Sequence, residues 1–285
     1  MNVLSLFDGM SCGQIALDRA GVKVDNYYAS ELDKYAIKVT QANYPDTVQL
    51  GDVTKWREWD IDWASIDLLI GGSPCQGFSF AGKQLAFDDP RSMLFFVYVD
   101  ILNHIRLVNP SVKFMLENVR MKKEYLGIIS DQLGVEPVFI NSALVSAQNR
   151  QRYYWANWVV GQPEDKGLIL ADILEKESDN FVFMSKKFVD RQKGRKCLRD
   201  DFTGKAGNLS AMEYVKNGRQ GDYINHGDGY RKLTPIECER LQTVPDNYTS
   251  HVSNTQRYKI LGNGWTVDVI AHIFNGLTAG QEVAA

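Results

Sequence analysis

Cysteine is scarce in this chain, and long apolar runs are missing. Four cysteines lie scattered among 285 residues with no C-x-x-C spacing, so neither a disulfide framework nor a zinc site is indicated. The longest apolar runs, such as residues 66–72, are too short to cross a bilayer. The chain reaches an acidic residue at Asp8 without a basic leader, so we expect no signal peptide. We therefore predict a reduced, cytoplasmic protein with no membrane segment and no metal.

An excess of positive charge, the usual mark of a nucleic-acid-binding protein, is also missing. The net charge is −3 and the isoelectric point is about 5.9, which by themselves speak against a nucleic-acid partner. Basic residues nevertheless gather between Lys186 and Arg199, where seven of them accompany the single acid Asp190. Such a run more often forms a solvated face than a binding surface, and charge alone leaves both readings open.

What the chain does contain is an alternation of short apolar runs and helical patterns. Hydrophobic residues make up 44% of it and charged residues 24%, as in ordinary globular proteins. Strands are predicted at 3–7, 24–29, 66–70, 113–116 and 152–158, and helices at 13–20, 32–43 and 92–108. This order predicts an α/β fold, a doubly wound and mostly parallel sheet with helices on both faces.

The pattern changes near Gly161. The segment from there to about Gly229 is polar, charged and glycine-rich, and shows neither strand nor helix periodicity. Order returns where Thr234, Pro235 and Glu237 form a helix-start signature, and a last helix is predicted at 266–277. We predict a main domain of residues 1–159 plus 230–285 and a small inserted domain of residues 160–229.

Three predicted strands end in residues suited to a nucleoside. The first runs into a glycine turn at Phe7, Asp8 and Gly9, the second ends at Glu31, and a third short strand ends at Asp52. Strand-end acids suit ribose hydroxyls and an adenine amino group, and parallel strand ends meet in one crevice. The glycine spacing is G-x-x-x-G and not the dinucleotide pattern. At this point a nicotinamide enzyme stays an alternative.

A second group of residues predicts covalent chemistry. Cys75 follows the central strand in a loop rich in proline and glycine, where a cysteine is presented as a nucleophile rather than packed in a core. Glu117 ends the next strand, and Arg150 and Arg152 alternate along an extended segment, so that they share a face. A thiol, a carboxyl group and a guanidinium are therefore predicted to converge at one edge of the sheet.

Together these motifs resemble the cytosine-5 DNA methyltransferase family, with similarity to both the phage or bacterial type and the animal de novo enzymes. They follow the family order over nearly the whole chain outside about 160–229. The matching segments are Phe7-Asp8-Gly9, Glu31, Gly51-Asp52, Ser73-Pro74-Cys75-Gln76, Asp89 to Phe95, Glu117-Asn118-Val119, Gln148 to Arg152, Thr234 to Gln242 and Leu261 to Gly264.

The resemblance implies a Rossmann-like class I methyltransferase that uses S-adenosyl-L-methionine and releases S-adenosyl-L-homocysteine. It implies that Cys75 adds to carbon 6 of a flipped-out cytosine in double-stranded DNA, that Glu117 and Arg152 stabilise the charge on the ring, and that Arg150 steadies the Cys75 loop or a phosphate. The residues that it assigns to the cofactor are Phe7, Asp8, Gly9, Glu31, Leu32, Asp52, Val53, Pro74, Leu94, Asn263 and Trp265.

The resemblance also implies that residues 160–229 recognise the DNA target, with phosphate contacts from the basic run, and that the loop 76–91 closes over the flipped base. The residues that it assigns to DNA are Gln76, Arg91, Arg191, Lys193, Arg195, Lys196, Asn208 and Ser210. Four residues depart from the family pattern. Ser11 replaces a common glycine, Trp265 replaces a small aliphatic residue, and Asn208 and Ser210 stand where threonines are usual.

Three alternatives stay open. The same chemistry on RNA is one, because one branch of the family methylates a transfer RNA. A catalytically silent DNA-binding homologue and a nicotinamide oxidoreductase are the others, disfavoured respectively by the complete catalytic set and by the missing G-x-G-x-x-G pattern. The sequence leaves a monomer and a weak homodimer equally possible, and is consistent with a bacterial cell or a phage-infected host.

Overall fold

A computed structural model describes residues 1–73, 93–211, 222–227 and 229–279. The chain divides into two compact units. The first contains residues 1–140, 151–162 and 270–285, and the second contains residues 141–150 and 163–269. The prediction that residues 160–229 form a recognition domain concerns function, and the division into two units does not test it.

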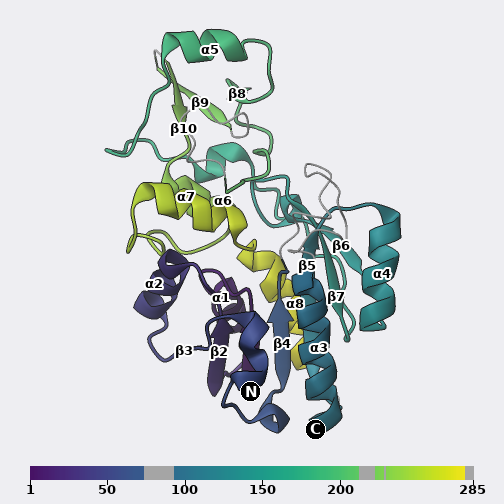
Figure 1. Cartoon of the computed structure of the whole chain (residues 1–285). Helices are drawn as coiled ribbons and strands as arrows, with labels where there is room; N and C mark the ends of the chain where they lie inside the picture. The colour runs from purple at the N-terminus through teal and green to yellow at the C-terminus, as the bar shows by residue number, and fades with distance from the viewer. Residues whose placement is uncertain (74–92, 212–221, 228, 280–285) are drawn as a thin grey trace. The chain divides into compact units, whose positions relative to one another are not determined.

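The first unit is built on a seven-stranded sheet of order β3-β2-β1-β4-β5-β7-β6 (Figure 1). Neighbouring strands from β3 to β5 are parallel, and β7 is antiparallel to β5. The strands are β1 (Asn2–Leu6), β2 (Asn26–Ser30), β3 (Val48–Gln49), β4 (Leu68–Gly71), β5 (Lys113–Val119), β6 (Val138–Asn141) and β7 (Gln151–Ala156). The order reverses between β1 and β4, and ligands of doubly wound sheets bind outside the strand ends at such a point.

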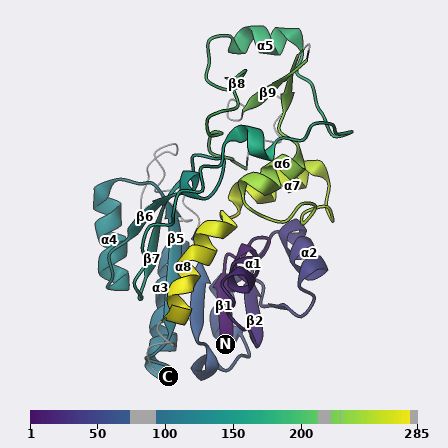
Figure 2. The ribbon, with the colours of Figure 1, turned by 180° about the vertical axis from the view of Figure 1, so that it is seen from behind.

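Helices connect these strands and cover the sheet. In Figures 1 and 2, α3 lies on the opposite face of the sheet from residues 270–279 of α8. The core between α3 and the sheet includes Leu69, Phe95, Ile105 and Phe114, all fully buried, which explains why the predicted runs are continuously apolar. The helices of the first unit are α1 (Cys12–Arg19), α2 (Lys34–Asn43), η1 (Val53–Glu58), η2 (Trp63–Ser65), α3 (Met93–Val108), α4 (Lys123–Leu133) and most of α8 (Val267–Ala279).

The second unit has more regular structure than its sequence pattern indicates. The segment for which no periodicity is evident contains a short basic helix, α5, and two strands of a three-stranded sheet of order β10-β9-β8, whose third strand, β10, begins where the segment ends. These strands are only two to four residues long, too short to produce a pattern. Its elements are η4 (Ser142–Leu144), η5 (Leu170–Ile173), α5 (Lys186–Gln192), β8 (Leu198–Arg199), β9 (Tyr223–His226), β10 (Gly229–Lys232), α6 (Pro235–Leu241) and α7 (Asn254–Asn263).

Candidate active site

The turn between β1 and α1 is held in an unusual backbone conformation. Phe7, Gly9 and Ser11 have φ angles of 57°, 62° and 59°, a region that glycine adopts easily and other residues rarely. Ser11, the departure from the family glycine, offsets this cost with two side-chain hydrogen bonds, one to Asp8 and one from Thr40 at 3.2 Å. The turn is therefore a fixed element of the structure.

Asp8 holds this turn from within. Its Oδ1 accepts a hydrogen bond of 2.7 Å from the Tyr27 hydroxyl, and its Oδ2 accepts one from Ser11. Burial raises the pKa of Asp8 from its ordinary value of 3.8 to about 6, against the lowering effect of these hydrogen bonds. The carboxyl group therefore stabilises the turn from inside, and the backbone of the turn is the part available to a ligand at the strand end.

Glu31, directly after β2, joins two of the strand-end loops. Its Oε2 accepts from the backbone N–H of Gly9 at 2.8 Å, and its Oε1 accepts from the N–H groups of Leu32 and Asp33 at 2.7 and 2.8 Å. These bonds fix the orientation of the carboxylate, and Oε2, which accepts one of them, still has a lone pair for a further donor. Leu32 beside it is 69% exposed, which is a large exposed apolar side chain next to a fixed carboxylate.

Asp52 and Val53 follow β3 at the start of η1. Asp52 Oδ1 accepts from the N–H and the hydroxyl of Thr54, at 2.9 and 2.8 Å, and these bonds lower the pKa of Asp52. Asp52 is thus a helix-capping carboxylate with its charge in solvent. Val53 is buried in the core, and Leu94 in α3 packs against the same core.

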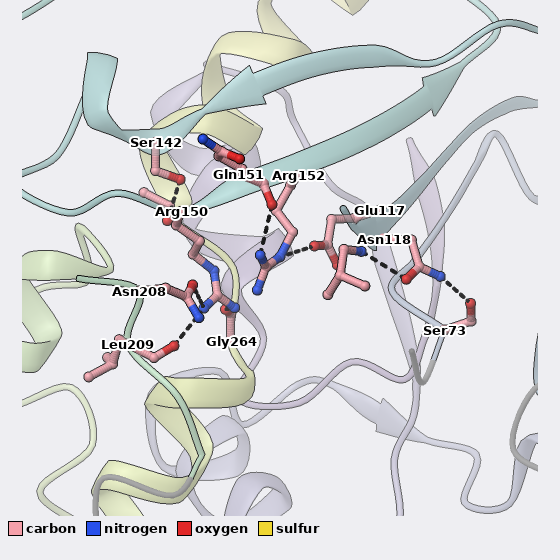
Figure 3. A network of polar contacts seen from close by, with 12 residues as sticks. Ser73, Glu117, Asn118, Ser142, Arg150, Gln151, Arg152, Asn208, Leu209 and Gly264 are labelled. Carbon is pink, nitrogen blue, oxygen red and sulfur yellow. Dashed lines mark hydrogen bonds and ion pairs between the residues drawn. The ribbon is translucent and has the colours of Figure 1, made fainter. Parts of the chain in front are cut away.

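Glu117 and Arg152 form an ion pair on neighbouring strands (Figure 3). The distance from Arg152 Nε to Glu117 Oε1 is 2.9 Å, and the two side chains are 13% and 12% exposed. The register explains the contact: Val119 lies opposite Arg152 in the antiparallel β5–β7 pair, so Glu117, two residues earlier, is the diagonal neighbour on the same face. The predicted convergence of this carboxyl group and this guanidinium is seen directly.

Two further residues at this edge have a role that the sequence does not indicate. Asn118, which is buried, donates from Nδ2 to Ser73 Oγ at 3.2 Å and accepts from the N–H of Val119 at 2.8 Å. Ser73 is the last described residue before the predicted nucleophile loop, so this bond ties the start of that loop to β5 (Figure 3). Four predicted site residues lie outside the described residues: Pro74, Cys75, Gln76 and Arg91.

Arg150 belongs to the second unit and lies just before β7, not within it. Only 4% of it is exposed, and its guanidinium donates to Asn208 Oδ1 and to the carbonyls of Leu209, Gly262 and Gly264 (Figure 3). The alternation with Arg152 therefore does not place Arg150 on a shared strand. The predicted contact of Arg150 with the Cys75 loop remains a prediction.

The predicted DNA-binding residues of the second unit are mostly at its surface. Arg191, Lys193, Arg195 and Lys196 are exposed in and after α5. Arg199, by contrast, pairs with Asp222 at 2.7 Å, with both side chains partly or largely buried. Asn208 is exposed and Ser210 half-buried, and so are Asn263 and Trp265, respectively, at the end of α7. The basic run thus contains exposed cations, one of which, Lys193, pairs with Asp190 at 2.8 Å, as well as the partly buried Arg199.

In residues 1–73, 93–211, 222–227 and 229–279, three or more histidine, cysteine or acidic side chains never gather closely enough to hold a metal ion. Over the same ranges, every helix is too short or too polar to span a membrane.

A family model described as C-5 cytosine-specific DNA methylase matches residues 1–156 and 140–279 of the chain. The type II methyltransferase M1.ScrFI of Lactococcus lactis subsp. cremoris is 32% identical over 302 residues, which cover 94% of this chain and 75% of that protein. The type II methyltransferase M.NlaX of Neisseria lactamica is 30% identical over 313 residues, which cover 99% of this chain and 98% of that protein.

The fold is also similar to that of solved methyltransferase structures. The Entamoeba histolytica methyltransferase EhMeth superposes with a TM-score of 0.79 at 16% identity, over 99% of this chain and 98% of that one. At this identity the similarity concerns the fold, and it confirms the predicted mostly parallel α/β architecture.

Proposed function

This chain belongs to the C-5 cytosine-specific DNA methylase family, and from that premise we propose how it methylates carbon 5 of cytosine in double-stranded DNA. Its methyl donor is S-adenosyl-L-methionine, which supplies an electrophilic methyl group on a sulfonium centre. The observation that carries the proposal is the Glu117–Arg152 pair at the carboxyl end of β5, in which a carboxyl group and a guanidinium lie side by side.

The strand-end residues of the first unit fit the nucleoside part of this donor. Glu31 is held by three backbone N–H groups, and its Oε2 keeps a lone pair for a ribose hydroxyl. Leu32 offers an exposed apolar surface for a purine ring, and Asp52 Oδ2 can accept from its amino group. We also assign to the methyl donor the turn Phe7–Gly9 and the residues Val53, Leu94 and Pro74. From the second unit we assign Asn263 and Trp265 to this donor.

The reaction begins with the Cys75 thiolate, which forms a bond to carbon 6 of the cytosine and pushes the ring electrons toward N3 and O2. Glu117, in its protonated form, gives its proton to N3, and Arg152 donates hydrogen bonds to O2, so that both stabilise charge where it develops. Carbon 5 then bonds to the methyl group as the bond from that group to the donor sulfur breaks, which releases S-adenosyl-L-homocysteine. A water takes the carbon 5 proton, the carbon 6–sulfur bond breaks to release the Cys75 thiolate, and the N3 proton returns to Glu117. Because carbon 5 is inaccessible in stacked DNA, the base leaves the helix first.

Residues 160–229 are proposed to recognise the DNA, with Arg191, Lys193, Arg195 and Lys196 at phosphates and Asn208 and Ser210 near base edges. Gln76 and Arg91 are assigned to DNA from the nucleophile loop, and residues 76–91 to closure over the base. We place the enzyme in the cytoplasm of a bacterial or phage-infected cell, because both sequence relatives named above are bacterial.

Bisulfite sequencing of a plasmid grown with the protein tests this function and reports the target sequence. Wild type is expected to protect cytosines in one short sequence, Cys75→Ala none, and Glu117→Gln to methylate roughly 10²- to 10³-fold more slowly in vitro. A covalent adduct on a 5-fluorocytosine duplex that is lost in Cys75→Ala would establish the nucleophile. If a labelled methyl group is transferred from the donor to RNA and not to DNA, the substrate is RNA. If wild type and Cys75→Ala are equally inactive on both polymers, the protein is a catalytically silent homologue.

A further inference from the structure

We propose that Arg150 is a positioning residue that couples the segment assigned to DNA to the segment assigned to the methyl donor. The inference rests on the proposed function, which assigns Asn208 and Ser210 to DNA, and Asn263 and Trp265 to the donor. All of these residues belong to the second unit, so the coupling is a property of that unit alone.

One guanidinium connects the two segments (Figure 3). Arg150 Nη1 donates to Asn208 Oδ1 at 3.1 Å and to the Leu209 carbonyl at 2.9 Å, while Nη2 donates to the carbonyls of Gly262 and Gly264 at 3.3 and 2.8 Å. The two carbonyls flank Asn263 and precede Trp265. By holding Asn208 Oδ1, Arg150 also fixes which way this exposed amide faces and presents its NH₂ group as the free donor.

The backbones of the two segments are in direct contact beside this guanidinium. A Cβ atom added at Gly262 would overlap the backbone of Ser210 and Ala211. Glycine is therefore required at this position of α7, and no side chain separates the segments. A displacement of residues 208–211 toward α7 must move residues 262–264, because close-packed interiors do not absorb such a shift.

A second, neutral chain of hydrogen bonds runs in parallel. Gln148 accepts from the N–H of Leu209 at 3.3 Å and donates to Gln242 Oε1 at 2.9 Å; Gln242 in turn donates to the carbonyls of Leu261 and Gly264 at 2.7 and 3.1 Å. Gln148 and Gln242 are fully buried. Both chains join the same two segments, and the Arg150 chain is the stronger because a charged donor makes stronger hydrogen bonds.

The geometry requires arginine and not only a positive charge. The planar fork directs Nη1 to one segment and Nη2 to the other, whereas the single ammonium of lysine cannot reach both sets of acceptors with good geometry. Arg150→Lys therefore keeps the charge and uncouples the segments. Arg240→Lys is the matched control in the same unit, since the half-buried Arg240 pairs with Asp246 and donates to the Ile173 carbonyl, and neither partner belongs to the two segments.

Hydrogen exchange of the full chain without ligand tests the coupling. In Arg150→Lys, exchange is expected to accelerate by roughly tenfold or more in both 206–211 and 261–266, because hydrogen bonds to a charged group are lost, while β9 and β10 keep their wild-type rates. Arg240→Lys should match wild type. Acceleration in one segment alone, or throughout the unit, would overturn the coupling. If Arg150→Lys does not fold, Asn208→Ala removes one acceptor at an exposed residue and should still accelerate exchange in 261–266.

A second experiment repeats the hydrogen-exchange measurement after S-adenosyl-L-homocysteine is added to the protein. In wild type, exchange should slow in 206–211 as well as in 261–266, and the effect on 206–211 should disappear in Arg150→Lys. Slowing confined to 261–266 in wild type would refute the coupling. If the ligand changes no segment, the donor assignment of the proposed function fails instead, and the ligand-free comparison still decides whether Arg150 couples the two segments.

Discussion

The two units of this chain bury their cores in different ways. In the first, strands β1, β4 and β5 are packed with aliphatic and aromatic side chains against α3. In the second, two complete ion pairs are buried: Arg231 with Glu237, and Arg257 with Glu239. An apolar core tolerates exchange of one apolar side chain for another of similar volume, whereas a buried charge is stable only when its partner is present. We therefore expect the stability of the second unit to depend more strongly on the identity of single buried residues.

The largest effect is expected from breaking a buried pair. Arg231 donates to both oxygens of Glu237, at 2.9 and 2.8 Å, and its guanidinium lies 4.0 Å from the ring centroid of Phe181. Arg231→Met leaves the carboxylate buried without its cation and should lower the free energy of unfolding by about 3–5 kcal/mol. Urea denaturation, followed by exchange at β9 and β10, measures the loss.

The double variant Arg231→Met, Glu237→Gln sharpens this test. Glutamine removes the unpaired charge and keeps an acceptor for the N–H of Thr234, which Glu237 binds at 2.8 Å in the capping box. The double variant is therefore expected to be more stable than Arg231→Met alone. If both are equally destabilised, packing around Phe181 and not the buried charge accounts for the difference between the units.

In the first unit, Asp8 is expected to make the free energy of unfolding depend on pH. Its pKa in the folded protein is about 6, above the ordinary 3.8, so the folded state binds the proton more tightly than the unfolded state. The resulting stabilisation is complete below about pH 4 and is lost as the pH rises through 6, a change of about 3 kcal/mol. Asp8→Asn should remove this dependence, measured as the difference in unfolding free energy from wild type between pH 4 and pH 8. A difference that stays constant would contradict the buried carboxyl assignment.

The sequence predicts the first unit better than the second, for a physical reason. Its buried strands are apolar runs bounded by glycine, and both features are local. The predicted bounds differ by one to three residues in most elements. In this unit α4 and β6 were not predicted, and β6 is only four residues long. In the second unit β8, β9 and β10 are so short that tertiary contacts, not periodicity, define them.

The site divides in the same way. Glu117 and Arg152 were predicted to converge because strand ends and alternation are visible in sequence, and the β5–β7 register brings them together. The partners of Arg150 were not predicted. Asn208 and Gly264 are 58 and 114 residues away, and no local pattern reports such contacts. The roles of Asn118 and Ser73 were missed for the same reason, although both belong to recognised motifs.

Helix caps provide a comparison in which the units should behave alike. Asp33 caps α2 by accepting from Tyr35 N–H at 2.9 Å, and Ser185 caps α5 by accepting from Phe188 N–H at 3.3 Å. Asp33→Ala and Ser185→Ala should each cost about 1 kcal/mol, seen as faster exchange in the first turn of the helix concerned. Ser185→Thr retains an acceptor and serves as control. A much larger loss for Ser185→Ala would mean that α5 is needed for the second unit to fold.

The smallest effect is expected where an ion pair lies in solvent. Arg240 binds Asp246 through both Nε and Nη2, yet the two side chains are 34% and 43% exposed. Arg240→Gln should therefore lower the free energy of unfolding by only about 0–1 kcal/mol, and the loss should shrink further in 1 M salt, which screens exposed charges. The destabilisation by Arg231→Met should not depend on salt, because that pair is out of reach of the solvent. Denaturation of both variants at low and high salt compares the exposed pair with the buried pair, which share the same bidentate geometry. A loss above 2 kcal/mol in Arg240→Gln that does not change with salt would show that burial does not determine the strength of ion pairs in this unit.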